Sequence, residues 1–148
     1  MKQKRKWIWT ACALALTGLW IFFIIHRSLK PAVISAEESK WMLTLMGIMP
    51  TQTADLLIRK TAHFLEFFIL GGLLWTDARL LCMEAFFLPI GVGALTAITD
   101  EVIQTFVPGR AGRFLDVVID TCGVIAACMI LRCFLRQRQR KKRKEGDS

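Results

Sequence analysis

The sequence predicts an all-α protein, an integral membrane bundle of four transmembrane helices with a short amphipathic helix on the outer surface. Composition is the first reason. Of the 148 residues 54% are hydrophobic, and a bilayer accepts more apolar surface than a soluble domain of this size can bury. The second reason is that the apolar residues form four separate segments. The length is that of one domain, which we assign to residues 1–148.

The first apolar segment, residues 7–25, contains no charged side chain and is long enough to span a membrane as a helix. The basic stretch before it, residues 1–6, is also typical of the start of a signal peptide. However, the apolar run is too long for such a peptide, and no clean cleavage site follows it. We therefore predict an uncleaved first transmembrane helix.

Three further apolar segments predict transmembrane helices at residues 61–76, 84–99 and 116–135. The first two of these are short for a full span, so we expect them to continue into their polar flanks. Pro89 is expected to kink the helix that contains it. Small residues would let the helices approach closely. These residues are Gly71, Gly72, Gly91, Gly93 and Gly123.

The segment between the first two transmembrane helices, residues 26–59, contains the pattern of a short amphipathic helix. Ser35 followed by Glu38 is a capping-box pattern that predicts where the helix begins, and Pro50 would end it. Trp41 lies among apolar residues on one side, which is typical of a helix that lies on a membrane surface. The alternative is a hydrophobic loop without a helix.

The distribution of basic residues predicts the orientation of the bundle. If both chain termini face the cytoplasm, that side holds most of the Lys and Arg residues, as the positive-inside rule requires. The basic tail, residues 136–148, would then lie in the cytoplasm and attract anionic lipid. Nucleic-acid binding is not predicted, because no aromatic residues alternate with these charges.

The five cysteines, at positions 12, 82, 122, 128 and 133, predict neither a disulfide framework nor a metal site. Their number is odd, their spacing does not fit zinc, and most lie within apolar runs as small hydrophobic residues. A single histidine, His63, accompanies the acidic residues of the helix ends, which argues against zinc there. We therefore assign no metal and no cofactor.

A histidine and two charged residues lie on one face of the predicted helix at 61–76. Lys60, His63 and Glu66 follow one another at intervals of three residues, which places them along the same side of a helix. A histidine and a carboxylate one turn apart in an apolar run can share a proton. The alternative is a pair that only satisfies itself inside the bundle, although ionisable groups within membrane segments are often functional.

Polar residues also concentrate between Asp100 and Asp120, where one predicted helix ends and the next begins. Asp100 and Gln104 are one helical turn apart, and so are Asp116 and Asp120. The helix dipole favours an acidic residue such as Asp116 in a first turn, but it does not account for the deeper Asp120. A Pro-Gly pair breaks the chain between the helices. Three more charged residues complete the stretch: Glu101, Arg110 and Arg113.

These opposite charges nearly balance, and two interpretations fit them. One is a network of salt bridges that holds three helices together. The other is a site in which arginine holds a phosphate while carboxylates perform acid–base chemistry or hold a divalent cation. The catalytic candidates are His63, Glu66, Asp100 and Glu101. The ligand-binding candidates are Lys60, Gln104, Arg110, Arg113, Asp116 and Asp120.

Three motifs, taken in order, resemble the VanZ family of small bacterial membrane proteins. The resemblance covers nearly the whole chain, because the first helix and the outer segment also match in place and length. The chain departs from the family at Ile103, where a histidine is common, and at Phe67, where a tyrosine is common. The motifs are Lys60-Thr-Ala-His-Phe-Leu-Glu66, Asp100-Glu101-x-x-Gln104-x-x-x-Pro-Gly-Arg110 and Asp116-x-x-x-Asp120-x-x-Gly123.

The resemblance implies a multi-pass protein of the bacterial plasma membrane with a role in the cell envelope. The founding member of the family is associated with resistance to the glycopeptide teicoplanin. We rank first the binding of, or action on, a phosphorylated or glycosylated envelope lipid or lipid-linked precursor. A non-enzymatic scaffold or accessory subunit comes second, and proton or ion transport through His63, Glu66 and Asp120 comes third. The residues leave turnover and oligomeric state open.

Overall fold

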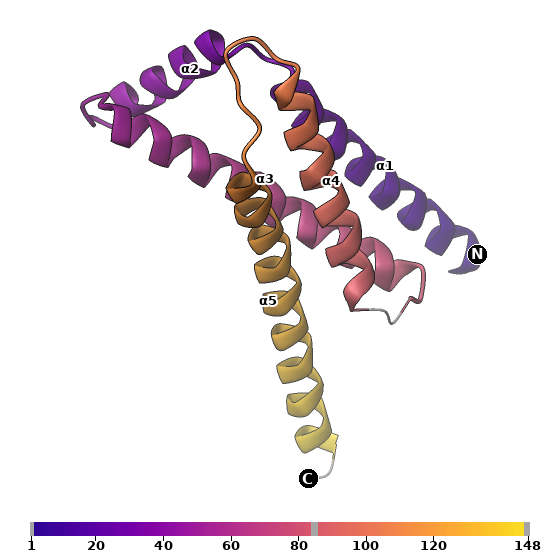
Figure 1. Cartoon of the computed structure of the whole chain (residues 1–148). Helices are drawn as coiled ribbons and strands as arrows, with labels where there is room; N and C mark the ends of the chain where they lie inside the picture. The colour runs from indigo at the N-terminus through magenta and orange to yellow at the C-terminus, as the bar shows by residue number, and fades with distance from the viewer. Residues whose placement is uncertain (1, 84–85, 147–148) are drawn as a thin grey trace.

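Five α-helices and no strand make up the described part of the chain, residues 2–83 and 86–146 of this computed structural model. The predicted all-α class is therefore confirmed. Four of the helices are long, and α2 is the short one (Figure 1). In chain order they are α1 (Lys2–Ser28), α2 (Ala32–Leu45), α3 (Gln52–Leu80), α4 (Phe87–Thr105) and α5 (Phe114–Gly146).

Three of these helices contain stretches long and apolar enough to cross a membrane: Lys6–Ser28 in α1, the whole of α4, and Phe114–Glu145 in α5. α3 has 29 residues, but His63, Glu66 and Asp77 interrupt its apolar run. The apolar helices fit a membrane protein. The fourth crossing stays a prediction.

The predicted apolar segments lie inside longer helices of the structure. Segments 7–25, 61–76 and 116–135 fall within α1, α3 and α5, and each of these helices continues into polar residues on at least one side. The predicted start of the remaining segment, residues 84 and 85, lies outside the described residues. These helices are therefore longer than their apolar runs, as we expected for the segment 61–76 in α3.

Three details predicted at prolines or helix caps are wrong, and one of them is the end of α2, which lies at Leu45 and not at Pro50. Pro89 does not kink the middle of α4, because the helix begins at Phe87 and the proline lies in its first turn, where no helical N–H is needed. α2 begins directly after Pro31, so the expected capping residue Ser35 lies one turn inside the helix. The fixed φ of a proline suits a helix start, and this start takes the place of the capping box.

The short helix α2 buries two serines and a leucine and exposes its charged side chains together with several large apolar ones. Ser39 and Leu43 are among its buried residues, whereas Trp41 and Leu45 are each 66% exposed. The hydroxyl of Ser39 donates a hydrogen bond to Asp55 of α3. Outward apolar side chains suit a helix at a membrane surface. The predicted short helix is therefore present, and its place on a membrane surface stays a prediction.

Glycines bring α3 and α5 into close contact. A Cβ on Gly71 of α3 would lie 2.7 Å from the backbone oxygen of Val124, and one on Gly123 of α5 would lie 2.5 Å from that of Phe64. Side chains at either position would therefore push the helices apart. Gly91 meets nothing within 4 Å, so its expected role in helix contact is wrong. The core beside this contact contains Ile24, Phe67, Leu70, Ala97, Val124 and Cys128.

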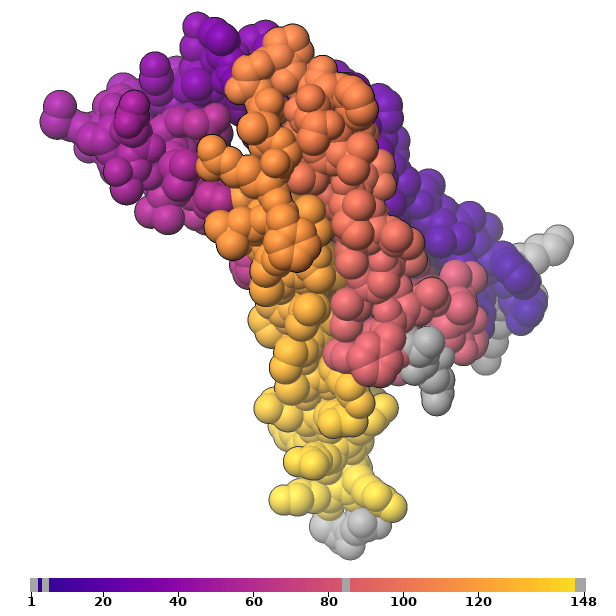
Figure 2. Space-filling view, viewed as in Figure 1, coloured from indigo at the N-terminus to yellow at the C-terminus, as the bar shows by residue number. Residues whose placement is uncertain are grey.

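The two ends of the bundle differ. Both chain termini lie at one end, which we call the terminal end (Figure 1). α2 and the loop between α4 and α5 lie at the other, the α2 end. The last part of α5 extends beyond the other helices at the terminal end (Figure 2). Large hydrophobic side chains such as Leu19, Leu95 and Ile130 are exposed along the helices, as on a surface that lipid covers.

Candidate functional site

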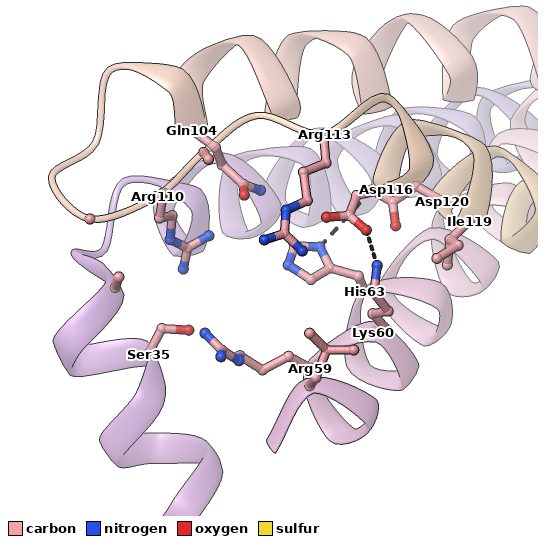
Figure 3. Close-up of a pocket in the computed structure, with 14 residues that line it drawn as sticks. Ser35, Arg59, Lys60, His63, Gln104, Arg110, Arg113, Asp116, Ile119 and Asp120 are labelled. Carbon is pink, nitrogen blue, oxygen red and sulfur yellow. Dashed lines mark hydrogen bonds and ion pairs between the residues drawn. The ribbon is translucent and has the colours of Figure 1, made fainter. Parts of the chain in front are cut away.

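A pocket of about 260 Å³ opens at the α2 end of the bundle. Its walls come from α2, α3, α4, α5 and the loop that joins α4 to α5 (Figure 3). Three predicted site residues, Glu66, Asp100 and Glu101, do not line it. The others do, and the fold therefore brings them together: Lys60, His63, Gln104, Arg110, Arg113, Asp116 and Asp120.

Helices α3 and α5 face each other in register beside the pocket. Lys60 forms an ion pair with Asp116. One turn further along both helices, Nδ1 of His63 lies 4.0 Å from Oδ2 of Asp120. The two residues spaced one turn apart on α3 thus lie opposite the two residues spaced one turn apart on α5. The close approach at Gly123 keeps the helices near enough for both contacts.

Glu66 has a different partner from the one expected. The sequence suggested a pair with His63 on the same helix, but Glu66 forms an ion pair with Arg27 of α1. The side chain of Glu66 is 10% exposed and that of Arg27 is 34% exposed, so the pair joins α1 to α3 at the edge of the interior. Sequence reasoning misses Arg27 because a basic residue in the last turn of an apolar helix looks like an ordinary boundary charge.

Asp100 of α4 is fully buried behind the pocket. It accepts a hydrogen bond from the hydroxyl of Ser28, the last residue of α1, and another of 2.8 Å from Nε2 of Gln104. The shared face predicted for Asp100 and Gln104 is therefore confirmed. The sequence analysis does not predict a role for Ser28. The one sequence feature that could have indicated this role is the position of Ser28 at the end of an apolar helix.

The loop between α4 and α5 is held in place from several sides. The side chain of Glu101 accepts a hydrogen bond from the backbone N–H of Arg113. The backbone oxygen of Pro108 accepts another from the N–H of Ala32. Gly109 has a φ of 76°, which glycine adopts more readily than other residues. The predicted Pro-Gly break is thus present, and it positions the arginines of the loop.

Two arginines of this loop point into the pocket without an acidic partner (Figure 3). Within the described residues, the guanidinium groups of Arg110 and Arg113 form no hydrogen bond and no ion pair. Burial lowers the pKa of Arg110 below its usual value, and the nearby Asp100 opposes that shift. Because the guanidinium groups of Arg110 and Arg113 have no acidic partner in the described part of the chain, the pocket has a surplus of positive charge. Two further cations line it with partners of their own, Arg59 with Asp55 and Lys60 with Asp116.

His63, Asp100 and Asp120 have the donor atoms and the spacing to hold a metal ion. One donor atom of each lies within 4.8 Å of the others. Because the three side chains come from α3, α4 and α5, no interval in the sequence predicts the group. Among the residues with described positions, this is the group whose donor atoms are both suitable for a metal ion and close enough together to share one.

A second pocket, of about 280 Å³, lies at the terminal end of the bundle. Arg79, Arg132 and Arg136 line it together with aromatic side chains. The guanidinium of Arg132 lies 4.5 Å from the centre of the Phe86 ring, a cation–π contact. None of the described residues that line it is acidic. This pocket includes the start of the basic tail.

The sequence model of a known family matches most of the chain. The match is to the family described as VanZ/LLP1 and covers residues 13–136, which include every residue that lines the pocket at the α2 end. No curated protein matches the chain. No solved structure matches it either.

Proposed function

The chain belongs to the VanZ/LLP1 family, and from this premise we propose that it binds a phosphorylated envelope lipid or lipid-linked precursor in the pocket at the α2 end. The phosphate would lie against Arg110 and Arg113, and the apolar part of the lipid would lie along exposed hydrophobic side chains. The single observation that carries the proposal is the pair of guanidinium groups that face the pocket without acidic partners.

Guanidinium groups without partners favour an anionic ligand. Arginine presents a planar fork of N–H donors that matches two oxygens of a phosphate, and such charge-assisted hydrogen bonds are stronger than neutral ones. Arg59 reaches into the same space from α3 and adds to the positive potential (Figure 3). A neutral sugar would gain less from this concentration of charge, so phosphate is the better match.

The surroundings of the pocket favour a lipid over a soluble phosphate. α2 contributes Ala32 and Ser35 to the pocket wall. The outward side of the same helix exposes Trp41 and Leu45. A ligand with its headgroup in the pocket can therefore lay a hydrocarbon chain against apolar side chains at the same end of the molecule.

The orientation of the bundle is part of the proposal. We propose that α3 crosses the membrane together with α1, α4 and α5, so that both termini lie in the cytoplasm and the pocket faces outward. The position of both termini at one end (Figure 1) and the basic residues gathered there support it. An outward site can meet envelope lipid precursors. Resistance to glycopeptides such as teicoplanin would follow from binding them.

Acid–base chemistry in this pocket would fall to His63. Of the catalytic candidates, His63 is the one that lines the pocket. The carboxylate of Glu66 is held by Arg27, and that of Glu101 by the backbone of Arg113. A group that acts on a bound ligand must lie within hydrogen-bond reach of it, which favours His63 over the two glutamates.

Ion pairs between helices favour a second function, that of a non-enzymatic scaffold or accessory subunit. Arg27 and Glu66 join α1 to α3, and Lys60 and Asp116 join α3 to α5. If the charges serve only to hold the helices together, Glu66→Gln lowers the abundance of the protein together with any phenotype. Normal abundance with a lost phenotype would exclude the scaffold.

We further propose that the pocket at the terminal end holds the headgroup of an anionic lipid from the cytoplasmic leaflet. Arg79, Arg132 and Arg136 supply positive charge there, and no acidic residue among the described lining residues opposes them. Basic residues close to an anionic leaflet each gain about 1 kcal/mol. This lipid would help to fix the orientation of the bundle.

Native mass spectrometry of the purified full-length chain tests the main proposal. We expect a co-purified phosphate-bearing lipid on the wild type and its loss from the Arg110→Ala/Arg113→Ala variant. Lys40→Ala is the control, because it removes a positive charge from an exposed position on α2. Equal lipid occupancy in the wild type and the double variant, with both folded by circular dichroism, would contradict the proposal.

A further inference from the structure

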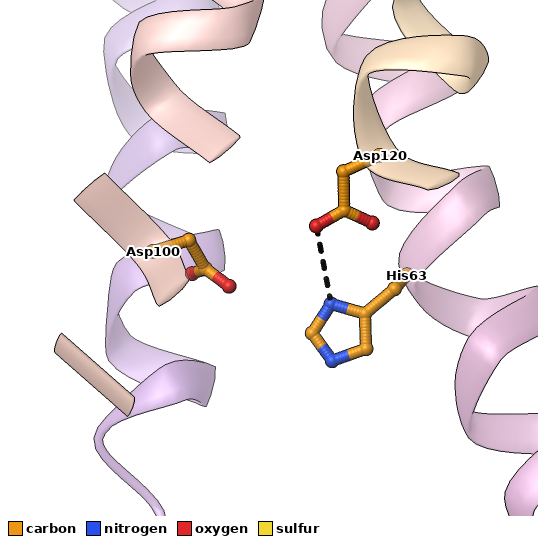
Figure 4. A group of neighbouring side chains, drawn as sticks. All are labelled: His63, Asp100 and Asp120. Carbon is orange, nitrogen blue, oxygen red and sulfur yellow. Dashed lines mark ion pairs between the residues drawn. The ribbon is translucent and has the colours of Figure 1, made fainter. Parts of the chain in front are cut away.

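Three side chains on three helices point their donor atoms into one small space (Figure 4). They are His63 of α3, Asp100 of α4 and Asp120 of α5, and one donor atom of each lies within 4.8 Å of the other two. An imidazole nitrogen and two carboxylate oxygens form a donor set that divalent transition metals accept. The helices thus converge on a candidate metal site.

Two of these side chains contain buried polar atoms that lack a partner. Nδ1 of His63 and Oδ1 of Asp120 make no hydrogen bond in the described part of the chain. The side chain of Asp120 is 1% exposed, and its other oxygen lies 4.0 Å from the imidazole, too far for a hydrogen bond. Buried polar atoms in folded proteins nearly always have a partner. An ion bound between the two side chains would supply it.

The two aspartates, Asp100 and Asp120, also lack a lysine or arginine as an ion-pair partner among the described residues. Two buried carboxylates that face each other are costly unless a positive charge lies between them. A divalent cation provides that charge and leaves the group neutral. Two neighbouring cations are paired with other carboxylates, Arg27 with Glu66 and Lys60 with Asp116. Arg110 lies near Asp100 but forms no ion pair with it.

Asp100 is held as a metal-binding carboxylate usually is. Ser28 donates a hydrogen bond to one of its oxygens and Gln104 to the other. Nε2 of Gln104 also lies 3.5 Å from the hydroxyl oxygen of Ser28, so the two residues that donate to Asp100 are in contact with each other. Each carboxylate oxygen can accept more than one contact, which leaves Asp100 free to bind an ion as well. Such orienting hydrogen bonds are common behind metal ligands.

We propose that His63, Asp100 and Asp120 bind one divalent transition-metal ion at the inner side of the pocket. Because His63 and Asp120 line the pocket, the open position of the ion would face the space where a ligand binds. Three protein ligands and an open position are typical of a catalytic metal site. Donors of a tetrahedral site lie about 3.4 Å apart for bonds of about 2.1 Å, so the side chains would close in on the ion.

The metal site departs from our expectation of no metal. That expectation rested on the spacing of the cysteines and on the presence of a single histidine, and spacing in the sequence cannot reveal ligands that come from three separate helices. The site also goes beyond the phosphate proposal and does not depend on it. Phosphate would bind through Arg110 and Arg113, neither of which is a metal ligand. The double arginine variant should therefore keep the metal, so that the two proposals can fail separately.

Electron paramagnetic resonance with Mn²⁺ as the probe tests the site in full-length protein stripped of metal. Mn²⁺ is suitable because thiolates prefer softer ions, so the cysteines compete little for it. We expect the wild type to bind one Mn²⁺ per chain and Asp120→Asn to bind it at least about tenfold more weakly. Asp77→Asn is the matched control, because it makes the same change at another buried aspartate, which accepts a hydrogen bond from Thr17 and is not a proposed ligand, so it should bind like the wild type.

Three results would overturn the proposal. One is equal Mn²⁺ affinity of the wild type and Asp120→Asn, and another is no binding by either. The third is equal weakening by Asp77→Asn, which would indicate that the loss of any buried carboxylate lowers the affinity. If Asp120→Asn does not fold, the wild type decides alone. Mn²⁺ must then raise its melting temperature, as a ligand of the folded state does, and an unchanged temperature overturns the site.

Discussion

His63 of α3 and Asp120 of α5 face each other with 4.0 Å between Nδ1 and Oδ2. One turn along the same two helices, Lys60 and Asp116 form an ion pair whose side chains are 25% and 29% exposed. Neighbouring contacts therefore differ in character, since the side chain of Asp120 is 1% exposed. The side chains of Lys60 and His63 are similarly exposed, so the difference lies in the aspartates. The partly exposed Asp116 pairs with Lys60, whereas the buried Asp120 keeps a donor atom available for a ligand.

The close contact of α3 and α5 predicts that Gly123→Ala destabilises the protein. The new Cβ would lie 2.5 Å from the backbone oxygen of Phe64, and overpacking of this kind costs about 1–3 kcal/mol. Denaturant titration in detergent, followed by circular dichroism, measures the change. Gly91→Ala is the control, because its Cβ would meet nothing within 4 Å, and it should cause no loss of stability. Equal stability of the two variants would contradict the packing.

The ion pair of Arg27 and Glu66 predicts a non-additive effect of mutation. Arg27→Met leaves a largely buried carboxylate without its partner, which costs about 1–3 kcal/mol of unfolding free energy. Adding Glu66→Gln removes the unpaired charge and should recover most of the loss. A double-mutant cycle on unfolding free energies measures the coupling. Strictly additive effects would show that the two side chains do not interact.

Hydrophobic patterning predicts the helices of this chain well, because each long apolar run must be helical inside a membrane. It also places Lys60 with His63, and Asp116 with Asp120, on shared helix faces. It cannot predict which face meets which, because the register between two helices depends on packing at glycines far away in the sequence. The pairing of Lys60 with Asp116 therefore becomes visible in the structure alone.

Residues at the end of α1 show where sequence reasoning stops. Arg27 and Ser28 follow an apolar helix, and such residues usually mark no more than the membrane boundary. In the structure they hold Glu66 and Asp100. These contacts join helices that are far apart in sequence, so no local sequence pattern predicts them. α2 begins at Ala32, directly after Pro31, whereas the capping-box pattern predicts a later start at Ser35.

The hydrogen bond from Ser28 to Asp100 predicts an indirect effect on metal binding. Ser28→Ala removes a donor that orients the carboxylate, and loss of such a donor weakens metal affinity by about 10–100-fold. Mn²⁺ titration of the purified protein measures it. Ser39→Ala is the control, because its hydroxyl bonds to Asp55 and not to a proposed ligand. Equal affinities in both variants would show that Ser28 does not orient the site.

Four crossings with both termini in the cytoplasm predict which positions an impermeant thiol reagent can reach. In a cysteine-free background, Lys40→Cys on α2 should react from outside intact cells, because its side chain is exposed at the α2 end. Gln137→Cys near the end of α5 should react only after the cells are opened. Labelling of Gln137→Cys in intact cells, or protection of Lys40→Cys, would refute the proposed orientation.

Discrimination between a polyprenyl phosphate and the matching polyprenol tests the central claim most directly, because the two lipids differ only in the phosphate. Binding to the purified full-length chain can be measured by microscale thermophoresis. We predict that the wild type binds the phosphate more than about tenfold tighter, since charge-assisted hydrogen bonds are each worth about 1.5–3 kcal/mol. Arg110→Ala/Arg113→Ala should bind both lipids alike, while Lys40→Ala keeps the preference. Equal affinity of the wild type for the two lipids, or an unchanged preference in the double variant, would contradict the account.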